Sequence, residues 1–248
     1  MTRDRWIALA AALGVVVLVA TARAQQLVAD LSSHLIAITT GFTGTEVVLF
    51  GAVDGPGDVA VVVQGPAGRV QVRRKERILG IWMNTRSVEF DDVPGYYSVA
   101  TSRPLERLAD PAVLAREEIG TANIVTTTVG TEPPGRVAEF REALIRGKRS
   151  QGLYPQAPGP VTFLGERLFR TTIHFPANVP TGPYTVGVFL FRDGQVVSAQ
   201  TTPLIVSKIG FSAEVYDFAT RQSLAYGITA LAVALAAGWT AGAVFRRI

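Results

Sequence analysis

The feature that most constrains this chain is an uncharged apolar segment near its C-terminus. Residues 224–245 are dominated by Ala, Leu, Val and Ile and contain no charged side chain. As an α-helix with a rise of about 1.5 Å per residue they reach about 33 Å, enough to cross the roughly 30 Å hydrocarbon core of a bilayer. Arg246 and Arg247 follow directly. Because cytoplasmic flanks of membrane helices are rich in Lys and Arg, we expect one membrane helix at 224–245 and a cytoplasmic tail at 246–248.

The N-terminus has the pattern of a secretory signal peptide. Arg3 and Arg5 precede a 14-residue apolar stretch at 7–20, and an Ala-x-Ala cleavage motif ends at Ala24. A basic region, a short apolar region and small residues in this order direct a chain to export. We therefore expect residues 1–24 to be removed and the bulk of the chain to be periplasmic, anchored in the inner (cytoplasmic) membrane. The alternative is an uncleaved signal anchor, which would add a second span.

The charge distribution argues against a nucleic-acid partner. The formal net charge is +4, but the excess lies at the two ends, and residues 25–245 hold 19 basic and 19 acidic side chains. Basic residues at the two ends of such a chain indicate its membrane topology and not the binding of a polyanion. The chain has no Cys, so its body must be stable without disulfides, and a body of about 200 residues can bury a sufficient core unaided.

Most of the residues between these ends read as β-strands. Runs of β-branched residues at 47–50 and 59–63 are bounded by Gly- and Pro-rich turns, and short strands separated by such turns are typical of sandwiches and barrels. Asp193-Gly194 between two further apolar runs is a strong hairpin signal. The sequence therefore predicts a predominantly β fold.

One motif occurs twice. Residues 88–99 and 173–186 both contain an apolar residue, a Phe, then Val-Pro, Gly and Tyr-x-Val, with an offset of 85 to 87 residues. This offset is close to the length of one immunoglobulin-like sandwich, which is about 100 residues. We therefore expect two immunoglobulin-like β-sandwich domains, at 25–104 and 121–210; the alternative is chance recurrence of a Pro-Gly turn before a strand.

Tyr97 and Tyr184 occupy the same place in both motifs, where the chain leaves the Pro-Gly turn and begins a strand. A Tyr at such a corner can bury its ring while its hydroxyl bonds a backbone group nearby. We expect both to be structural corner residues.

Helices interrupt and follow the strands. Asp110 as N-cap and Pro111 as first helical residue begin a short helix in a helical connection at 105–120. A second helix is expected at 135–147, because its apolar residues fall on one face and Gly147 can cap its end. Residues 211–223 form a juxtamembrane segment.

Several short motifs together resemble an uncharacterised family of transmembrane proteins from alphaproteobacteria (Alph_Pro_TM-like). They are Leu49-Phe50-Gly51-Ala52, Gln64-Gly65-Pro66, Arg73-Arg74-Lys75, Gly80-Ile81-Trp82-Met83-Asn84 and Arg103-Pro104-Leu105. The resemblance implies no catalytic residues, because the family has no established activity. Genes of the family often lie beside sulfite-exporter-like permeases of the TauE/SafE type, so the resemblance implies a permease partner.

Catalytic motifs are missing from the sequence. The two histidines, His34 and His174, are 140 residues apart, and no zincin, nucleophile-elbow or phosphate-loop motif is present. The adjacent pair Asp91-Asp92 lacks further oxygen ligands at a calcium-binding spacing and reads as a solvated corner. We expect no enzyme activity, no cofactor and no metal site.

A basic cluster at 73–77 is the most pronounced local charge feature of the sequence. On a strand, Arg73, Lys75 and Arg77 would share one face as a row of three cations, and Gly80-Ile81-Trp82 follows closely. Such a row could hold an oxyanion, touch lipid phosphates or meet an acidic partner. The alternative is a solvated edge strand that its charges protect from aggregation.

Small residues recur every four positions in the apolar segment, at Ala230, Ala234, Gly238 and Gly242. They would form one ridge of a helix, where small side chains let a second membrane helix approach closely. The ridge predicts docking to a permease helix or to a second copy of the chain; in an Ala-rich segment, chance is the alternative.

These observations predict a membrane-anchored, exported, non-enzymatic accessory subunit of a membrane complex, such as that of an anion or sulfite exporter-like permease. The alternative is a periplasmic domain that binds or senses a small oxyanion such as sulfite or sulfate at the row of Arg73, Lys75 and Arg77. The expected partners are the lipid bilayer and either an integral membrane permease or further copies of this chain.

Overall fold

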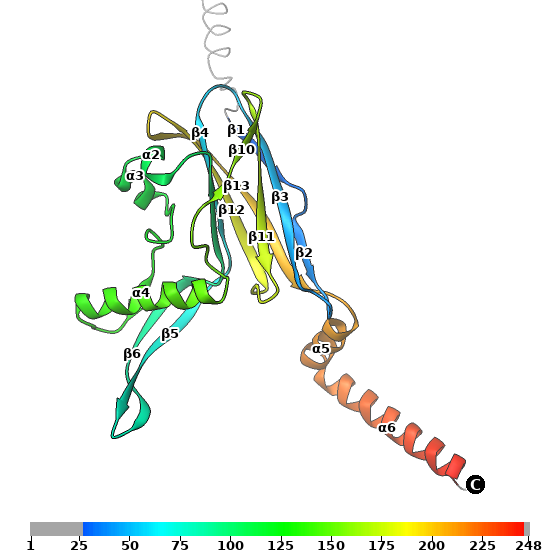
Figure 1. Ribbon diagram of the computed structural model, residues 1–248. Coiled ribbons are helices and arrows are strands. Elements are labelled where there is room, and N and C mark those ends of the chain that lie inside the picture. Colours follow the sequence, from blue (N-terminus) through cyan, green and yellow to red (C-terminus); the bar gives the residue numbers. More distant parts are fainter. Residues whose placement is uncertain (1–26, 246–248) are drawn as a thin grey trace, which may run out of the picture.

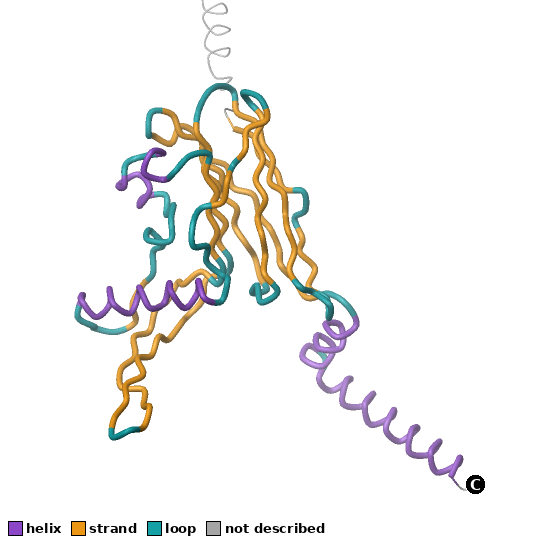
Figure 2. The backbone as a smooth tube through the Cα atoms, viewed as in Figure 1, coloured by secondary structure: helices purple, strands orange, loops and turns teal. Residues whose placement is uncertain are grey.

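The computed structural model describes residues 27–245 (Figure 1). The expected signal peptide and the expected cytoplasmic tail lie outside the described residues. The described chain is built mostly from strands, with a few short helices, one longer helix beside the sandwich and one C-terminal apolar helix (Figure 2). The predominantly β class that the sequence predicts is therefore confirmed.

Two sheets pack face to face as a β-sandwich. The four-stranded sheet has the order β1 (Leu27–Leu31), β3 (Gly44–Val53), β11 (Leu168–Pro176), β10 (Thr162–Leu164). The six-stranded sheet has the order β2 (Leu35–Ile38), β13 (Gln195–Lys208), β12 (Gly182–Arg192), β4 (Asp58–Gln64), β7 (Tyr97–Thr101), β9 (Gly159–Pro160). Neighbouring strands are antiparallel except for the pairs β2–β13 and β7–β9.

The division into two successive sandwiches is wrong, because strands from both predicted domains share the same sheets. β3 pairs with β11 from Gly44↔Pro176 to Ala52↔Leu168. β4 pairs with β12 in the other sheet, again across the predicted boundary. Buried residues of all four strands belong to a single hydrophobic core. The two copies of the motif therefore lead into two strands, β7 and β12, of the same six-stranded sheet.

The six-stranded sheet is buried on both faces around β4. Five consecutive residues of β4, Val59 to Val63, are buried, whereas β11 alternates buried and exposed positions as in a sheet with one wet face. The helices α2 (Leu105–Leu108) and α3 (Pro111–Arg116) supply buried side chains to the same core. They correspond to the helical connection expected at 105–120.

A third sheet and a helix form an arm beside the sandwich (Figure 1). The sheet has the order β5 (Ala67–Ile78), β6 (Ile81–Pro94), β8 (Thr127–Val129), and α4 (Pro134–Ser150) packs on it. A small separate core joins β6 to α4, made of Val88, Phe90, Val93, Phe140 and Leu144. The helix expected at 135–147 is present, but it continues through Gly147 to Ser150, so Gly147 is not its cap.

The chain leaves the sandwich through α5 (Phe211–Arg221) and α6 (Ser223–Phe245). The α6 helix is long and apolar enough to cross a membrane, and its surface is exposed instead of being part of the core. The expected apolar helix at 224–245 is confirmed to within one residue. The juxtamembrane segment is itself helical, which the sequence did not predict.

The two corner tyrosines are buried and hydrogen-bonded differently. The Tyr184 hydroxyl donates to the carbonyl of Pro180, four residues earlier, at 2.6 Å. The Tyr97 hydroxyl donates to the carbonyl of Glu118 at 2.7 Å and accepts the amide of Gly120 at 2.8 Å, so it ties the chain after α3 to the sheet. Burial raises the pKa of both hydroxyls, which stay protonated at neutral pH.

Replacement of these hydroxyls tests this arrangement. We expect Tyr97→Phe to lower the free energy of unfolding by about 1–3 kcal/mol, because it leaves two buried backbone groups without their partner. Tyr184→Phe removes one partner and should have the smaller effect. Chemical denaturation of the two variants measures both values; equal stability of Tyr97→Phe and the wild type would contradict the assigned role.

Candidate functional site

The arm carries the basic residues that the sequence singled out. In β5, Val70 and Val72 pack against the small core beneath α4, and the Arg74 Nη1 lies 2.9 Å from the Glu139 Oε1 of that helix. Because successive side chains of a strand alternate between faces, Arg73, Lys75 and Arg77 lie on the opposite face. Residues 70–78 of β5 are paired with β6 in unbroken sequence, and the register shift between Arg74 and Lys75 skips Thr85 of β6. The row of three cations is therefore on the exposed face of the arm.

These three cations do not converge on one point. Arg73 donates to the Gln71 Oε1 from its Nε at 2.9 Å and its Nη2 at 2.6 Å, and the Arg77 Nε donates to the carbonyl of Gly80 at 3.2 Å. At about 3.3 Å per strand residue the row extends over about 13 Å. Such a spacing suits an extended anionic surface better than one small oxyanion held by two guanidinium groups.

The end of the arm is an exposed apolar group that the sequence patterns did not identify as a site. Its members, which we call the hairpin tip, are Ile78, Leu79, Ile81, Trp82 and Met83, all exposed. The signal was available: an Ile-Leu-Gly-Ile-Trp-Met sequence puts large apolar residues at the turn of a hairpin, where polar turn residues are usual.

Of the Asp91-Asp92 pair in β6, Asp91 is engaged by a cation of the protein itself, whereas the Asp92 Oδ2 accepts a hydrogen bond from the Thr127 Oγ1 at 3.4 Å. The Arg69 Nη2 lies 3.1 Å from the Asp91 Oδ2, and its Nε lies 3.4 Å from the Glu89 Oε1. The hydrogen bond from Arg69 lowers the pKa of Asp91. Among residues 27–245, no cluster of three His, Asp or Glu side chains is placed to hold a metal.

The two histidines lie in different parts of the sandwich. The His34 Nε2 is 2.9 Å from the Asp30 Oδ1, and the His174 Nδ1 is 3.9 Å from the Glu46 Oε1. All four side chains are exposed. Neither histidine is presented to a hydroxyl nucleophile in a described hydrogen bond, so this arrangement does not resemble a catalytic triad.

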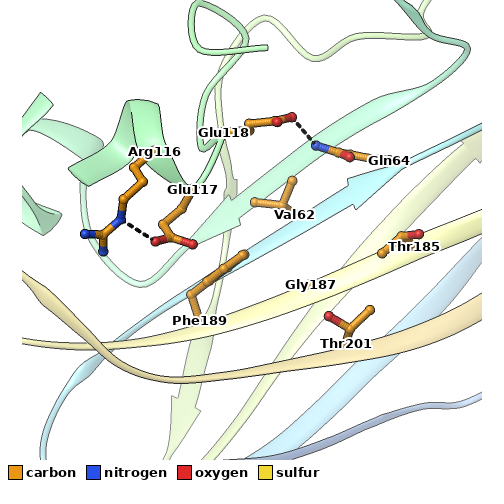
Figure 3. A pocket seen from close by; sticks show the side chains of 9 residues that line it. All are labelled: Val62, Gln64, Arg116, Glu117, Glu118, Thr185, Gly187, Phe189 and Thr201. Carbon is orange, nitrogen blue, oxygen red and sulfur yellow. Dashed lines mark hydrogen bonds and ion pairs between the residues drawn. The ribbon is translucent and has the colours of Figure 1, made fainter. Parts of the chain in front are cut away.

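A pocket of about 240 Å³ lies where α3 meets the outer face of the six-stranded sheet (Figure 3). Both of its carboxylates are engaged: Glu117 with the Arg116 Nε at 2.9 Å, and Glu118 with the Gln64 Nε2 at 3.1 Å. Apart from these pairs its wall is Val62, Thr185, Gly187, Phe189 and Thr201. Each carboxylate of this pocket therefore already has a partner within the protein.

The outer face of the four-stranded sheet carries a second apolar surface, which we call the sheet patch. The register places Val28, Ala52, Leu168 and Leu164 in one row across four strands. In the next row, Phe50 lies between Asp30 and Arg170. Together the residues of both rows border a hollow of about 370 Å³. The patch lies near the β10–β11 turn, at the end of the sandwich opposite to α5 (Figure 1).

The small residues of the apolar segment all lie within α6. Their spacing puts Ala230, Ala234, Gly238 and Gly242 along one side of the helix. A Cβ added at Gly238 would meet no described atom within 4 Å. Their role in helix packing stays a prediction.

Comparison with known proteins gives one result that covers almost the whole chain. Residues 26–247 match the model of a family described as "Putative transmembrane protein (Alph_Pro_TM)". No curated protein matches the sequence. The matched region includes the sandwich, the arm and α6, in agreement with a membrane protein whose largest part is a β-sandwich. The chain belongs to the Alph_Pro_TM family of transmembrane proteins.

Proposed function

We propose that this protein is a single-pass, exported membrane protein whose sandwich acts as a non-enzymatic accessory subunit of a membrane complex. The sheet patch is the observation that carries the proposal. Arg246 and Arg247 after α6, together with the export pattern at the N-terminus, support a periplasmic sandwich and a cytoplasmic C-terminus.

The sheet patch has the composition of a protein interface. Its centre is a row of aliphatic side chains, and Phe50 stands beside them with its ring half exposed. Asp30 and Arg170 border Phe50 in the register and give the patch a polar edge. An aromatic residue in an apolar centre with a polar rim is typical of interfaces between proteins.

The partner that fits this surface is an integral membrane protein with a periplasmic portion. A helix anchor confines the sandwich to the membrane surface, so a partner in the same membrane meets it at a raised effective concentration. The patch lies at the end of the sandwich opposite to α5, where it could contact a partner's extramembrane part (Figure 1). A permease of the sulfite-exporter type is the specific candidate that the family resemblance suggests.

Substitution of Phe50 tests the accessory role. We expect Phe50→Glu to abolish co-purification of a stoichiometric membrane partner in mild detergent, because the change places an unpaired carboxylate in an apolar contact. Val197, which is exposed on β13 to a similar degree, supplies the matched control Val197→Glu. Recovery of the same partner in equal yield with wild type, Phe50→Glu and Val197→Glu would exclude the sheet patch as the interface. A stable chain that purifies without any partner would contradict the accessory role.

The row of Arg73, Lys75 and Arg77 supports a second candidate function, the binding of a small oxyanion. Three cations share one exposed face, although two of them donate to neighbours in the hairpin. Thermal unfolding of the full chain in sulfite or sulfate discriminates the two functions. A stabilisation that saturates with anion and disappears in Arg73→Gln and Arg77→Gln would favour the binder.

A further inference from the structure

We propose that the hairpin tip inserts into the head-group region of the bilayer that α6 crosses, so that the protein contacts the membrane at two separate places. The inference rests on the proposed membrane location of α6 and adds a lipid-binding site that is independent of the partner. Its observations concern the backbone of the tip, the side chains around it, the charges behind it and its place in the fold.

The backbone at the apex places a large apolar side chain at maximal exposure. Leu79 and Gly80 form the two-residue connection of the hairpin, with φ values of 53° and 86°. Two central residues with positive φ correspond to a type I′ turn, which favours Asn-Gly. Leu79 is instead an aliphatic residue in a left-handed conformation and is 98% exposed. Neither turn propensity nor burial within the protein explains a Leu at this position, so we assign it to an external apolar contact.

The residues on both sides of the apex continue the apolar surface. Ile78 faces Ile81 and Arg77 faces Trp82 across the hairpin, and Met83 follows. All three apolar residues of β6 are more than half exposed. Trp beside aliphatic residues is the composition that proteins use at the boundary between head groups and acyl chains.

The arm becomes more basic toward its tip. Near the sandwich, Arg69 is outnumbered by Glu89, Asp91 and Asp92; in residues 73–86, five cations accompany a single carboxylate, Glu76. The distal cations are Arg73, Arg74, Lys75, Arg77 and Arg86. An apolar end with cations directly behind it is complementary to a bilayer that contains anionic lipids, because the cations meet the phosphates when the apolar end enters the interface.

The dimensions agree with interfacial insertion. β5 contributes Ile78 to the tip and β6 contributes Ile81, Trp82 and Met83, so at about 3.3 Å per residue the tip reaches a depth of about 5–10 Å. Arg77 is level with Trp82, and Lys75 lies two residues further from the apex, so both cations would meet the head groups when the apex enters the interface. Within the arm, α4 packs on the hairpin through Phe140 and Leu144 and through the Arg74–Glu139 ion pair, so the hairpin is supported behind its tip.

The place of the tip in the fold also agrees. The arm extends past the end of the sandwich at which α5 and α6 leave it, and the sheet patch lies at the other end (Figure 1). Contact of the tip with the bilayer would therefore leave the sheet patch free for a protein partner. This second contact would also fix the orientation of the sandwich relative to the membrane plane. A single membrane helix joined through α5 does not fix it.

A probe on the tip tests lipid insertion directly. The chain has no Cys, so Ile81→Cys gives one labelling site for an environment-sensitive fluorophore in the otherwise wild-type full chain. Val197→Cys, near the opposite end of the sandwich, is the matched control. Both proteins are placed in nanodiscs of phosphatidylcholine and phosphatidylglycerol. We expect lipids with a shallow doxyl group to quench the Ile81 probe while aqueous iodide does not, and the reverse at Val197.

Two comparisons distinguish contact of the tip with lipid from contact with water or with a protein. Leu79→Asn suits a type I′ turn and removes the apolar apex, so in the Ile81→Cys chain it should preserve the melting temperature and lose most of the doxyl quenching. An Ile81 probe that iodide reaches as readily as Val197 would overturn the proposal. Protection from iodide without doxyl quenching would also overturn it, and would assign the tip to protein contact. The Phe50→Glu variant should retain full doxyl quenching, which separates this result from the accessory role.

Discussion

Residues 27–104, produced without the rest of the chain, are expected to remain unfolded, although they hold seven of the strands. β3 loses its nine-residue pairing with β11, and β4 loses its seven-residue pairing with β12. Phe169, Phe175 and Leu190 of the core belong to the missing segment. Without them, the inward side chains of β3 and β4 would be exposed to water. β3 would keep only β1 as a neighbour and β4 only β7, so each would become an open edge, a state that does not persist as a soluble fold.

Residues 27–208, which contain every strand of the described part of the chain, are the matched control for this experiment. Near-ultraviolet circular dichroism and thermal unfolding compare the two fragments. We expect a cooperative transition for 27–208 and none for 27–104. A cooperative transition of similar midpoint in residues 27–104 alone would contradict the single sandwich and restore the division at 105–120.

The second large effect concerns α6. A chain that ends after Gln222 is expected to pass from the membrane fraction to the supernatant on alkaline extraction, whereas the full chain stays in the membrane. The reason is that α6 supplies the one described segment, Ser223–Gly242, that is long and apolar enough to span, and the interior of the protein buries none of it. The hairpin tip is too shallow to retain the chain by itself, because interfacial contacts are reversible.

Gly238→Leu with Gly242→Leu is the control for the anchoring experiment. Both changes keep the helix apolar, so the double variant should remain in the membrane, which separates anchoring from helix packing. Retention of the chain that ends after Gln222 would contradict the role of α6 as the anchor.

The sequence predicted the local elements of this fold because their signals are local. Runs of β-branched residues gave β3 and β4, a one-sided apolar pattern gave α4, and the absence of charge gave α6. Strand pairing is a non-local property, and a repeated motif does not report it. The similar motifs at Tyr97 and Tyr184 lead into two strands of the same six-stranded sheet.

The site was predicted in part for the same reason. Strand alternation placed Arg73, Lys75 and Arg77 on one face. Which other cations lie near this row depends on the fold of the arm, and the local sequence does not show it. The sheet patch was not predicted, since apolar residues such as Leu49 and Phe50 occupy both faces of β3 and the sequence does not show which face is covered. The tip was missed because turns usually hold polar residues and Gly, so the apolar run at 78–83 did not indicate the end of a hairpin.

Two-sided labelling tests the central claim, a sandwich and a C-terminus on opposite sides of one membrane. The absence of Cys allows one chain with Val197→Cys and another with a Cys added after Ile248. Spheroplasts are treated with a membrane-impermeant maleimide before and after lysis. The account predicts that the Val197→Cys chain is labelled in intact spheroplasts and the C-terminal Cys only after lysis. Labelling of both chains before lysis, or of the C-terminal Cys alone, would contradict it.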